Sequence, residues 1–260
     1  MTGLRPIRRR LAWSALSLAL LLVAVPGCSK SSPAKPTVKV LLIGDSIMKQ
    51  GGAFVGDELR SMPGVDNVEV RNEGRNGTGP LTPHLFDWYA ATKRYLAEQH
   101  PDIVVVLFVG NYTSTDLYRD RNGVLVEPYG SDFFRAWEYE TRRIVQLAAG
   151  SGADVYLVDP PPMITAEGQR RVSLFRAINR QIAQDYTNTV IINGTKVLSD
   201  SSGNFALSLP NSDGQMVQVR TFDTVHLTEA GARILATEIA RQIAPSVLVA
   251  QRRAQQRTAG

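Results

Sequence analysis

The chain is poor in cysteine and histidine: it has one cysteine, Cys28, and three histidines among 260 residues. A single cysteine cannot form an internal disulfide, so the folded part of the chain must be stabilised by its hydrophobic core. A long membrane-spanning run is also missing, because the apolar stretch at residues 11–25 is shorter than the ~20 residues that a spanning helix needs. No repeat or internal linker interrupts the rest, which predicts one domain of roughly two hundred residues.

Acidic residues are missing from the start of the chain, where four arginines precede the apolar stretch. A basic start, a short apolar run and a small residue, Gly27, predict an export signal over residues 1–27. Cys28 follows at once, and this placement resembles a bacterial lipobox, which implies a lipid anchor on Cys28 in the membrane of the cell envelope. The export route is Sec or, given Arg8-Arg9-Arg10, twin-arginine. The alternative is an ordinary signal with an incidental cysteine, and hence a secreted or periplasmic protein.

The formal net charge is also small once the predicted export signal, residues 1–27, is left out. The four arginines within residues 1–27 are matched by no acid, so the formal net charge of +5 falls to +1. This balance gives no reason to expect a nucleic-acid partner. We predict a polar tether at residues 28–36, a folded domain at 37–247 and a polar C-terminal tail at 248–260. No periodic apolar stripe marks an interface, so we expect a monomer.

The domain alternates β-rich apolar runs with amphipathic helical stretches. This alternation predicts a flavodoxin-like three-layer α/β/α sandwich with a mostly parallel five-stranded sheet, whose functional loops gather at the carboxyl ends of the strands. Two long segments, 112–130 and 205–219, fall outside the alternation and are candidates for substrate contacts, the second as a hairpin. The strands are expected at residues 38–43, 68–70, 102–109, 154–158 and 190–192, and the helices at 54–60, 85–98, 132–149, 167–184 and 229–243.

A candidate nucleophile, Ser46, follows the first predicted strand in the sequence Gly44-Asp45-Ser46. A serine in a tight turn at a strand end can point its hydroxyl into the crevice above the sheet, and the glycine permits that turn. Taken alone, this tripeptide is as typical of an ordinary turn and helix cap. The assignment therefore depends on a partner elsewhere in the chain.

The partner is His226, in the loop before the last predicted helix. Asp223 lies three residues earlier and can turn back to accept a hydrogen bond from Nδ1 of the imidazole. That contact leaves Nε2 to take the proton of a serine. The other histidines, His84 and His100, are expected to serve as capping or surface residues.

Acyl transfer also needs donors for the oxyanion that develops on the attacked carbonyl. A glycine-rich loop at residues 70–79 follows the second strand, and Gly110-Asn111 follows the third. The backbone N–H of Gly77 and the side-chain amide of Asn111 are expected to face the same crevice. The loop lacks the Gly-Lys-Ser/Thr ending of a phosphate cradle and the spacing of a dinucleotide site.

Taken together, these segments resemble the four motif blocks of the SGNH/GDSL hydrolases, in that family's order, over nearly the whole domain. The resemblance implies the SGNH hydrolase fold and an acyl-enzyme mechanism with no metal or cofactor. It implies that Ser46 is the nucleophile and, through its backbone N–H, an oxyanion donor, with Gly77 and Asn111 as the other donors. It also implies that Asp223 orients His226, the base.

The chain departs from the family pattern at two places. Tyr112 follows Asn111 where an aspartate is common, and Thr224 follows Asp223 where glycine is frequent. In addition, Lys49 and Arg75 place positive charge near the crevice. We expect Lys49, Arg75 and Tyr112 to contact an anionic or sugar-bearing substrate; the alternative for the two cations is a solvated surface position.

The predicted function is that of a serine esterase acting on acyl esters, O-acetyl or short-chain, of envelope or extracellular carbohydrates. Its acyl-enzyme forms on Ser46 and is resolved by water. Two alternatives remain. One is an O-acyltransferase that passes the acyl group to a sugar hydroxyl with the same triad, and the other is a non-catalytic carbohydrate-binding lipoprotein. The intact set of site residues argues against the second.

Overall fold

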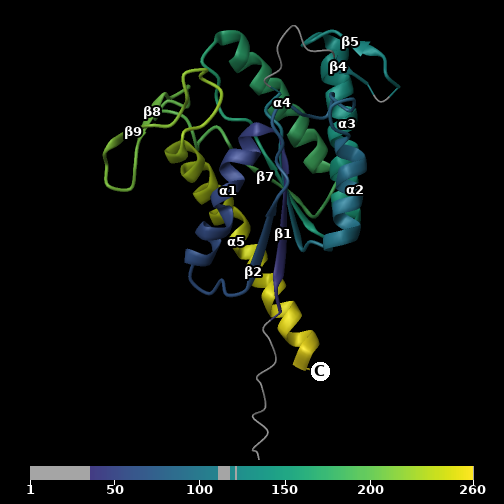
Figure 1. The fold of residues 1–260 in the computed structure, drawn as a ribbon, viewed down its shortest axis with the longest axis vertical. Coiled ribbons are helices and arrows are strands. Elements are labelled where there is room, and N and C mark those ends of the chain that lie inside the picture. The colour runs from purple at the N-terminus through teal and green to yellow at the C-terminus, as the bar shows by residue number, and fades with distance from the viewer. Residues whose placement is uncertain (1–35, 111–117, 121, 260) are drawn as a thin grey trace, which may run out of the picture. The chain divides into compact units, whose positions relative to one another are not determined.

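The computed structural model describes residues 36–110, 118–120 and 122–259. Its centre is a five-stranded sheet in the order β2-β1-β3-β6-β7, in which every pair of neighbours is parallel (Figure 1). This is the predicted sheet, and every strand end lies within two residues of its predicted position. They are β1 (Val38–Gly44), β2 (Val68–Asn72), β3 (Ile103–Leu107), β6 (Asp154–Val158) and β7 (Thr189–Ile192).

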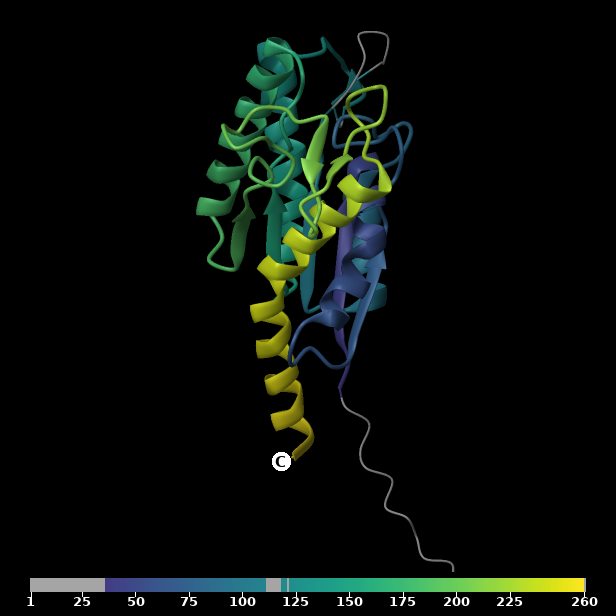
Figure 2. The ribbon, with the colours of Figure 1, turned by 90° about the vertical axis from the view of Figure 1, so that its left-hand side faces the viewer.

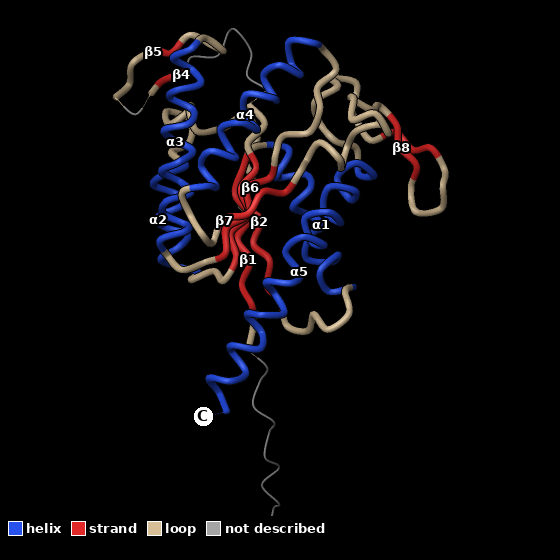
Figure 3. Tube along the Cα trace, turned by 180° about the vertical axis from the view of Figure 1, so that it is seen from behind, coloured by secondary structure: helices blue, strands red, loops and turns tan. Residues whose placement is uncertain are grey.

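Helices cover both faces of this sheet. One face is covered by α1 (Ser46–Ser61) and α5 (Glu229–Ala259), and the other by α2 (Trp88–Gln99), α3 (Ser131–Gly150) and α4 (Ala166–Gln184). Figures 1 and 3 show the two helical layers on either side of the strands, which confirms the α/β/α sandwich.

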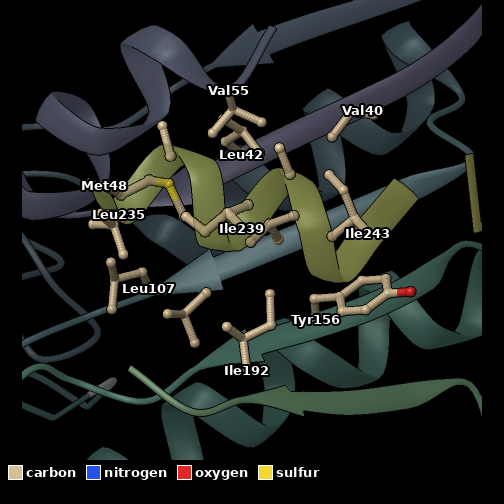
Figure 4. Close-up of a cluster of buried hydrophobic side chains, with 14 of the residues drawn as sticks. Val40, Leu42, Met48, Val55, Leu107, Tyr156, Ile192, Leu235, Ile239 and Ile243 are labelled. Atoms are coloured by element: carbon tan, nitrogen blue, oxygen red, sulfur yellow. The ribbon is translucent and has the colours of Figure 1, made fainter. Parts of the chain in front are cut away.

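The nearly continuous apolar runs of the central strands follow from this double cover. Along β1, Val40 and Leu42 pack toward α1 and α5, whereas Leu41 and Ile43 pack toward the opposite helices. Figure 4 shows Leu42 among side chains of α1 and α5 in the first of these two clusters. A strand buried on both faces can be apolar at every position, and this is the pattern that the sequence has.

Helix α1 begins earlier than predicted, at Ser46 instead of residue 54. Its first turns combine the buried Ile47 and Met48 with polar residues and two glycines, so apolar periodicity marks them only weakly. Asp45 caps the helix, since its carboxylate accepts a hydrogen bond from the backbone N–H of Ile47 at 3.0 Å. Gly51 lies against α5, where a Cβ would come 2.6 Å from a methyl carbon of Leu235. The composition of this start of α1 therefore reflects close helix packing and the site at its N-terminus.

Helix α5 extends to Ala259, so the predicted tail at 248–260 is helical up to that residue. Its polar residues are good helix formers, and no glycine or proline interrupts the helix after Pro245 until residue 260. Figure 2 shows these last turns continuing past the amino ends of the strands. None of the helices in the described part of the chain combines the length and apolar character needed to cross a bilayer.

Two short antiparallel hairpins stand at the other end of the sheet, near the carboxyl ends of the strands (Figure 1). The first joins β4 (Tyr118–Arg119) to β5 (Leu125–Val126) within the segment that did not fit the alternation. The second joins β8 (Ser208–Pro210) to β9 (Met216–Gln218), which confirms the predicted hairpin. Both hairpins thus lie on the side of the sheet where the candidate site is found.

Candidate active site

Ser46, His226 and Asp223 form a continuous hydrogen-bonded chain. Nε2 of His226 lies 2.9 Å from Oγ of Ser46, and Nδ1 lies 2.6 Å from Oδ2 of Asp223. The serine is the first residue of α1 and the other two lie in the loop before α5, so residues 180 positions apart in the sequence meet here. The structure brings together the three residues that the sequence singled out.

The second oxygen of Asp223 is held by its own loop. Oδ1 accepts hydrogen bonds from the backbone N–H groups of Val225 and His226, each at 2.9 Å, and from the hydroxyl of Thr221 at 2.7 Å. Burial alone would raise the pKa of Asp223, but these bonds and the one from the imidazole hold that pKa well below its usual value. The carboxylate therefore stays ionised, which favours a proton on Nδ1 and leaves Nε2 to accept the proton of Ser46.

A sharp turn at Thr224 makes this arrangement possible. Thr224 has φ of 62°, in the left-handed region that non-glycine residues rarely adopt, and its hydroxyl donates to the carbonyl of Asp223 at 2.6 Å. The turn directs the next two backbone N–H groups back to the carboxylate. The threonine in place of the family's frequent glycine thus keeps the geometry at the cost of local strain.

Arg220 supports the same loop from inside the protein, and the sequence did not single it out for a role. Its side chain is fully buried and donates to the carbonyl of Val225 at 2.8 Å and to that of Pro162 at 3.1 Å. Burial lowers the pKa of Arg220 to about 10, so the guanidinium remains charged at neutral pH. The only local signal for this role is an arginine three residues before Asp223, which no pattern distinguishes from a surface cation.

Asp45 fixes the nucleophile turn (residues 44–46) against the neighbouring strand, β3. Besides capping α1, its carboxylate accepts a hydrogen bond from the backbone N–H of Val109, just beyond β3, at 2.6 Å. Gly44 is required here, since a side chain would collide with the carbonyl of Leu107. Burial raises the pKa of Asp45 to about 6. Hydrogen bonds from backbone N–H groups of α1 and of the segment after β3 oppose this shift.

The predicted oxyanion donors are only partly within the described residues. The loop that carries Gly77 is tied to the nucleophile turn, because the backbone N–H of Arg75 donates to the carbonyl of Gly44 at 2.9 Å. Gly77 has φ of 67°, in the region that favours glycine, and nothing lies within 4 Å of the position of a Cβ. Asn111 and Tyr112 lie outside the described residues. The donor roles of Gly77 and Asn111 stay predictions.

One pocket, of about 220 Å³, borders the loop of the histidine at Thr224 and Val225. Among the described residues that line it, Arg171 is the one cation, and it stacks over the ring of Tyr129 at 3.5 Å. The hydroxyl of Tyr129 donates to the carbonyl of Gly110 at 2.9 Å. Most of the remaining wall is apolar, so the pocket suits an uncharged group. This wall includes Val109, Met163, Ile164, Val172 and Phe175.

A second hollow, of about 440 Å³, is lined by the first turn of α1 and the loop after β2. It brings Lys49 and Arg75 to the same surface. Their contact with a substrate stays a prediction. Arg75 stacks over Phe86 at 4.2 Å and lies 3.8 Å from the carboxylate of Glu73, whereas the Lys49 side chain is exposed. The hollow is mostly polar, in contrast to the pocket beside Thr224.

The remaining histidines lie in exposed positions away from the triad. His84 precedes α2 instead of opening it, and His100 ends α2 with φ of 47°. Within the described ranges, no group of three or more His, Cys, Asp or Glu side chains is placed to bind a metal ion.

Residues 39–242 match the model of a family described as "Protein of unknown function (DUF459)". The chain belongs to the DUF459 family. No curated protein sequence matches this DUF459 member. Solved structures do resemble this chain, but their sequence identities to it are low enough that the likeness shows only a shared fold.

The acetyl xylan esterase AlAXEase is 22% identical over 79% of this chain and 100% of its own, with a TM-score of 0.57. A catalytic mutant of Axe2, an acetylxylan esterase from Geobacillus stearothermophilus, is 20% identical over 80% and 96%, with a TM-score of 0.57. A G-D-S-L family protein from Desulfitobacterium hafniense is 16% identical over 78% and 98%, with a TM-score of 0.54. This DUF459 member therefore has the SGNH/GDSL serine hydrolase fold.

Proposed function

We propose that this DUF459 member is a serine esterase that hydrolyses acyl esters of envelope or extracellular carbohydrates through an acyl-enzyme on Ser46. The observation that carries the proposal is the hydrogen-bonded chain from Ser46 Oγ through both ring nitrogens of His226 to Asp223, at 2.9 and 2.6 Å. A nucleophile, a base and an ionised orienting group in this order are the parts that serine acyl transfer needs.

In the first step, Oγ of Ser46 attacks the ester carbonyl and its proton passes to Nε2 of His226. Asp223 stabilises the imidazolium that results. The carbonyl oxygen gains charge and is met by the N–H groups of Ser46 and Gly77 and the amide of Asn111. The alcohol leaves with the proton from the imidazole, and a water molecule activated by the same base releases the acid.

The size and lining of the pocket beside Thr224 support a short acyl group. Its volume of about 220 Å³ is modest, and its wall is largely apolar. Pockets for drug-sized ligands span roughly 300–1,000 Å³, so a cavity below that range suits an acetyl or similar short group.

The polar hollow at Lys49 and Arg75 supports a sugar as the alcohol part of the ester. Hydroxyl groups and an occasional carboxylate of a polysaccharide suit its cations and the partly buried aromatic ring of Phe86. Outside this hollow, Phe222 directly precedes Asp223, and its ring is 99% exposed. Two solved structures with this fold are acetylxylan esterases, which agrees with an acylated polysaccharide as substrate class.

The N-terminal pattern supports an envelope location, with the lipid anchor on Cys28 that the lipobox resemblance implies. Residues 1–35 lie outside the described residues, so this part of the proposal rests on the sequence. Mass spectrometry of the protein purified from membranes is expected to find a diacylglyceryl group on Cys28. A Cys28→Ser protein that stays in the membrane fraction would contradict the anchor.

The activity is tested by labelling with a fluorophosphonate probe and by the release of acetate from acetylated xylan. Wild type is expected to label and to release acetate, and Ser46→Ala is expected to do neither. Ser61→Ala, at the exposed far end of the same helix, serves as the control and is expected to match wild type. A folded wild-type protein that does not label would contradict the esterase proposal. Addition of an acceptor sugar separates hydrolysis from acyl transfer.

A further inference from the structure

Gln50 joins the nucleophile helix to the histidine loop by two hydrogen bonds. Its side-chain Nε2 donates to the carbonyl of Leu227 at 3.1 Å, and its Oε1 accepts from the N–H of the same residue at 3.0 Å. Gln50 lies four residues after Ser46, which places both on one face of α1. Leu227 directly follows His226. One amide group thus links the turn after the nucleophile to the residue after the base.

The backbone of Leu227 is open to this contact because of how it pairs on its other side. Leu227 and Arg220 form an antiparallel bridge, and the adjoining hydrogen bonds run from Thr221 N–H to the carbonyl of His226 and from Thr228 N–H to that of Val219. In such a pair, the N–H and carbonyl of the bridged residue point away from its partner. Both groups of Leu227 therefore face α1, where Gln50 satisfies them.

We propose that Gln50 is a positioning residue that holds His226 at proton-transfer distance from Ser46. This inference rests on the proposed esterase function. The direct contact between the two side chains, Nε2 to Oγ, is broken whenever the serine carries an acyl group. The amide of Gln50 fixes the same spacing through atoms that take no part in the reaction. The base therefore stays in place to activate water in the second half of the cycle.

Packing of α5 on α1 does not by itself hold His226 at this distance from Ser46. The two helices contact each other closely (Figure 1), but α5 begins at Glu229, three residues after the histidine. Asp223 and Arg220 hold the loop to itself and to Pro162, and neither reaches α1 in these contacts. The bonds from Gln50 tie the residue next to the base directly to the helix of the nucleophile.

Gln50→Met tests the proposal, because it keeps the length of the side chain and removes both hydrogen bonds. We expect kcat for 4-nitrophenyl acetate, and the rate of fluorophosphonate labelling, to fall by about 10- to 100-fold with KM changed less than about threefold. The matched control is Gln181→Met on the exposed side of α4, which is expected to keep wild-type values.

Making the same substitution in a His226→Ala protein distinguishes a role in positioning the base from a role in stabilising the fold. In His226→Ala, the base is gone and its placement no longer matters, so adding Gln50→Met is expected to change the residual rate by less than about twofold. Equal proportional losses in both backgrounds, or full activity of a folded Gln50→Met protein, would overturn the proposal. If that variant is recovered unfolded, Gln50→Glu, which keeps an oxygen for Leu227 N–H, carries the same comparison. A His226→Ala protein that labels as fast as wild type would instead contradict the esterase function itself.

Discussion

The carboxylate of Asp45, the residue before the nucleophile, accepts a 2.6 Å hydrogen bond from the backbone N–H of Val109 at the exit of the neighbouring strand. The same group caps the helix that starts with Ser46. One buried side chain therefore sets the nucleophile turn against the segment that leads to Gly110 and the predicted donor Asn111. These hydrogen bonds explain why an acidic side chain is tolerated at a buried position.

The position of Asp45 predicts a pH-dependent stability. Burial raises its pKa from 3.8 to about 6, so between these values the folded protein holds a proton that the unfolded chain releases. Stability from this group is therefore present in acid and lost as the pH rises through that window. Relative to Asp45→Asn, wild type is expected to lose on the order of 3 kcal/mol between about pH 4 and pH 7. Urea unfolding of both proteins across this range measures it, and a constant difference would contradict the expectation.

Asp223→Asn is expected to impair catalysis with little effect on folding. An amide in place of the carboxylate no longer selects the Nδ1–H tautomer or stabilises the imidazolium, so kcat should fall by about 10³- to 10⁴-fold. The comparison uses Asp213→Asn, at the exposed tip of the β8–β9 hairpin, which is expected to retain wild-type kcat. Similar rates for the two variants would show that Asp223 does not orient the base.

Thr224→Gly is expected to stabilise the protein. Threonine is held at φ of 62°, where its Cβ crowds the backbone and glycine does not. The gain should be about 0.5–1 kcal/mol, because glycine also makes the unfolded chain more flexible and the hydroxyl contact with Asp223 is lost. Thermal unfolding of the two proteins checks this. A lower midpoint for the glycine variant would mean that the hydroxyl outweighs the strain.

Arg220→Met is expected to lower both stability and activity. The carbonyls of Val225 and Pro162 lose their donors, which should reduce the free energy of unfolding by about 2–4 kcal/mol. Arg252→Met, at an exposed position of α5, is the control and should cost less than about 0.5 kcal/mol. Urea unfolding gives both values. Equal stability of the two variants would mean that the buried guanidinium offsets its hydrogen bonds by its own desolvation.

The sequence predicted the sheet and the triad because both leave local signals. A run such as Ile103–Leu107 is apolar at every position, and the triad residues stand in short motifs beside strand ends or a helix start. The start of α1 was missed because Gly51 and Gly52 weaken the helical pattern there. The helical end of α5 was missed because its polar residues resemble a tail.

The supporting contacts could not be predicted for a different reason. Gln50 and Leu227 are 177 residues apart, and nothing near either one specifies the other. Arg220 acts through backbone carbonyls, which every residue has. Such roles depend on how α1 and the last loop are packed, and packing is a property of the whole domain.

The distance along the chain between Ser46 and His226 also has a consequence for synthesis. A ribosome completes the nucleophile 180 residues before it reaches the histidine, and α5, which completes the cover over one face of the sheet, follows later still. Until then the serine has no base, and the face that α5 covers remains open. By the proposed mechanism, Ser46 therefore lacks its base until the histidine loop has been synthesised and has packed against α1.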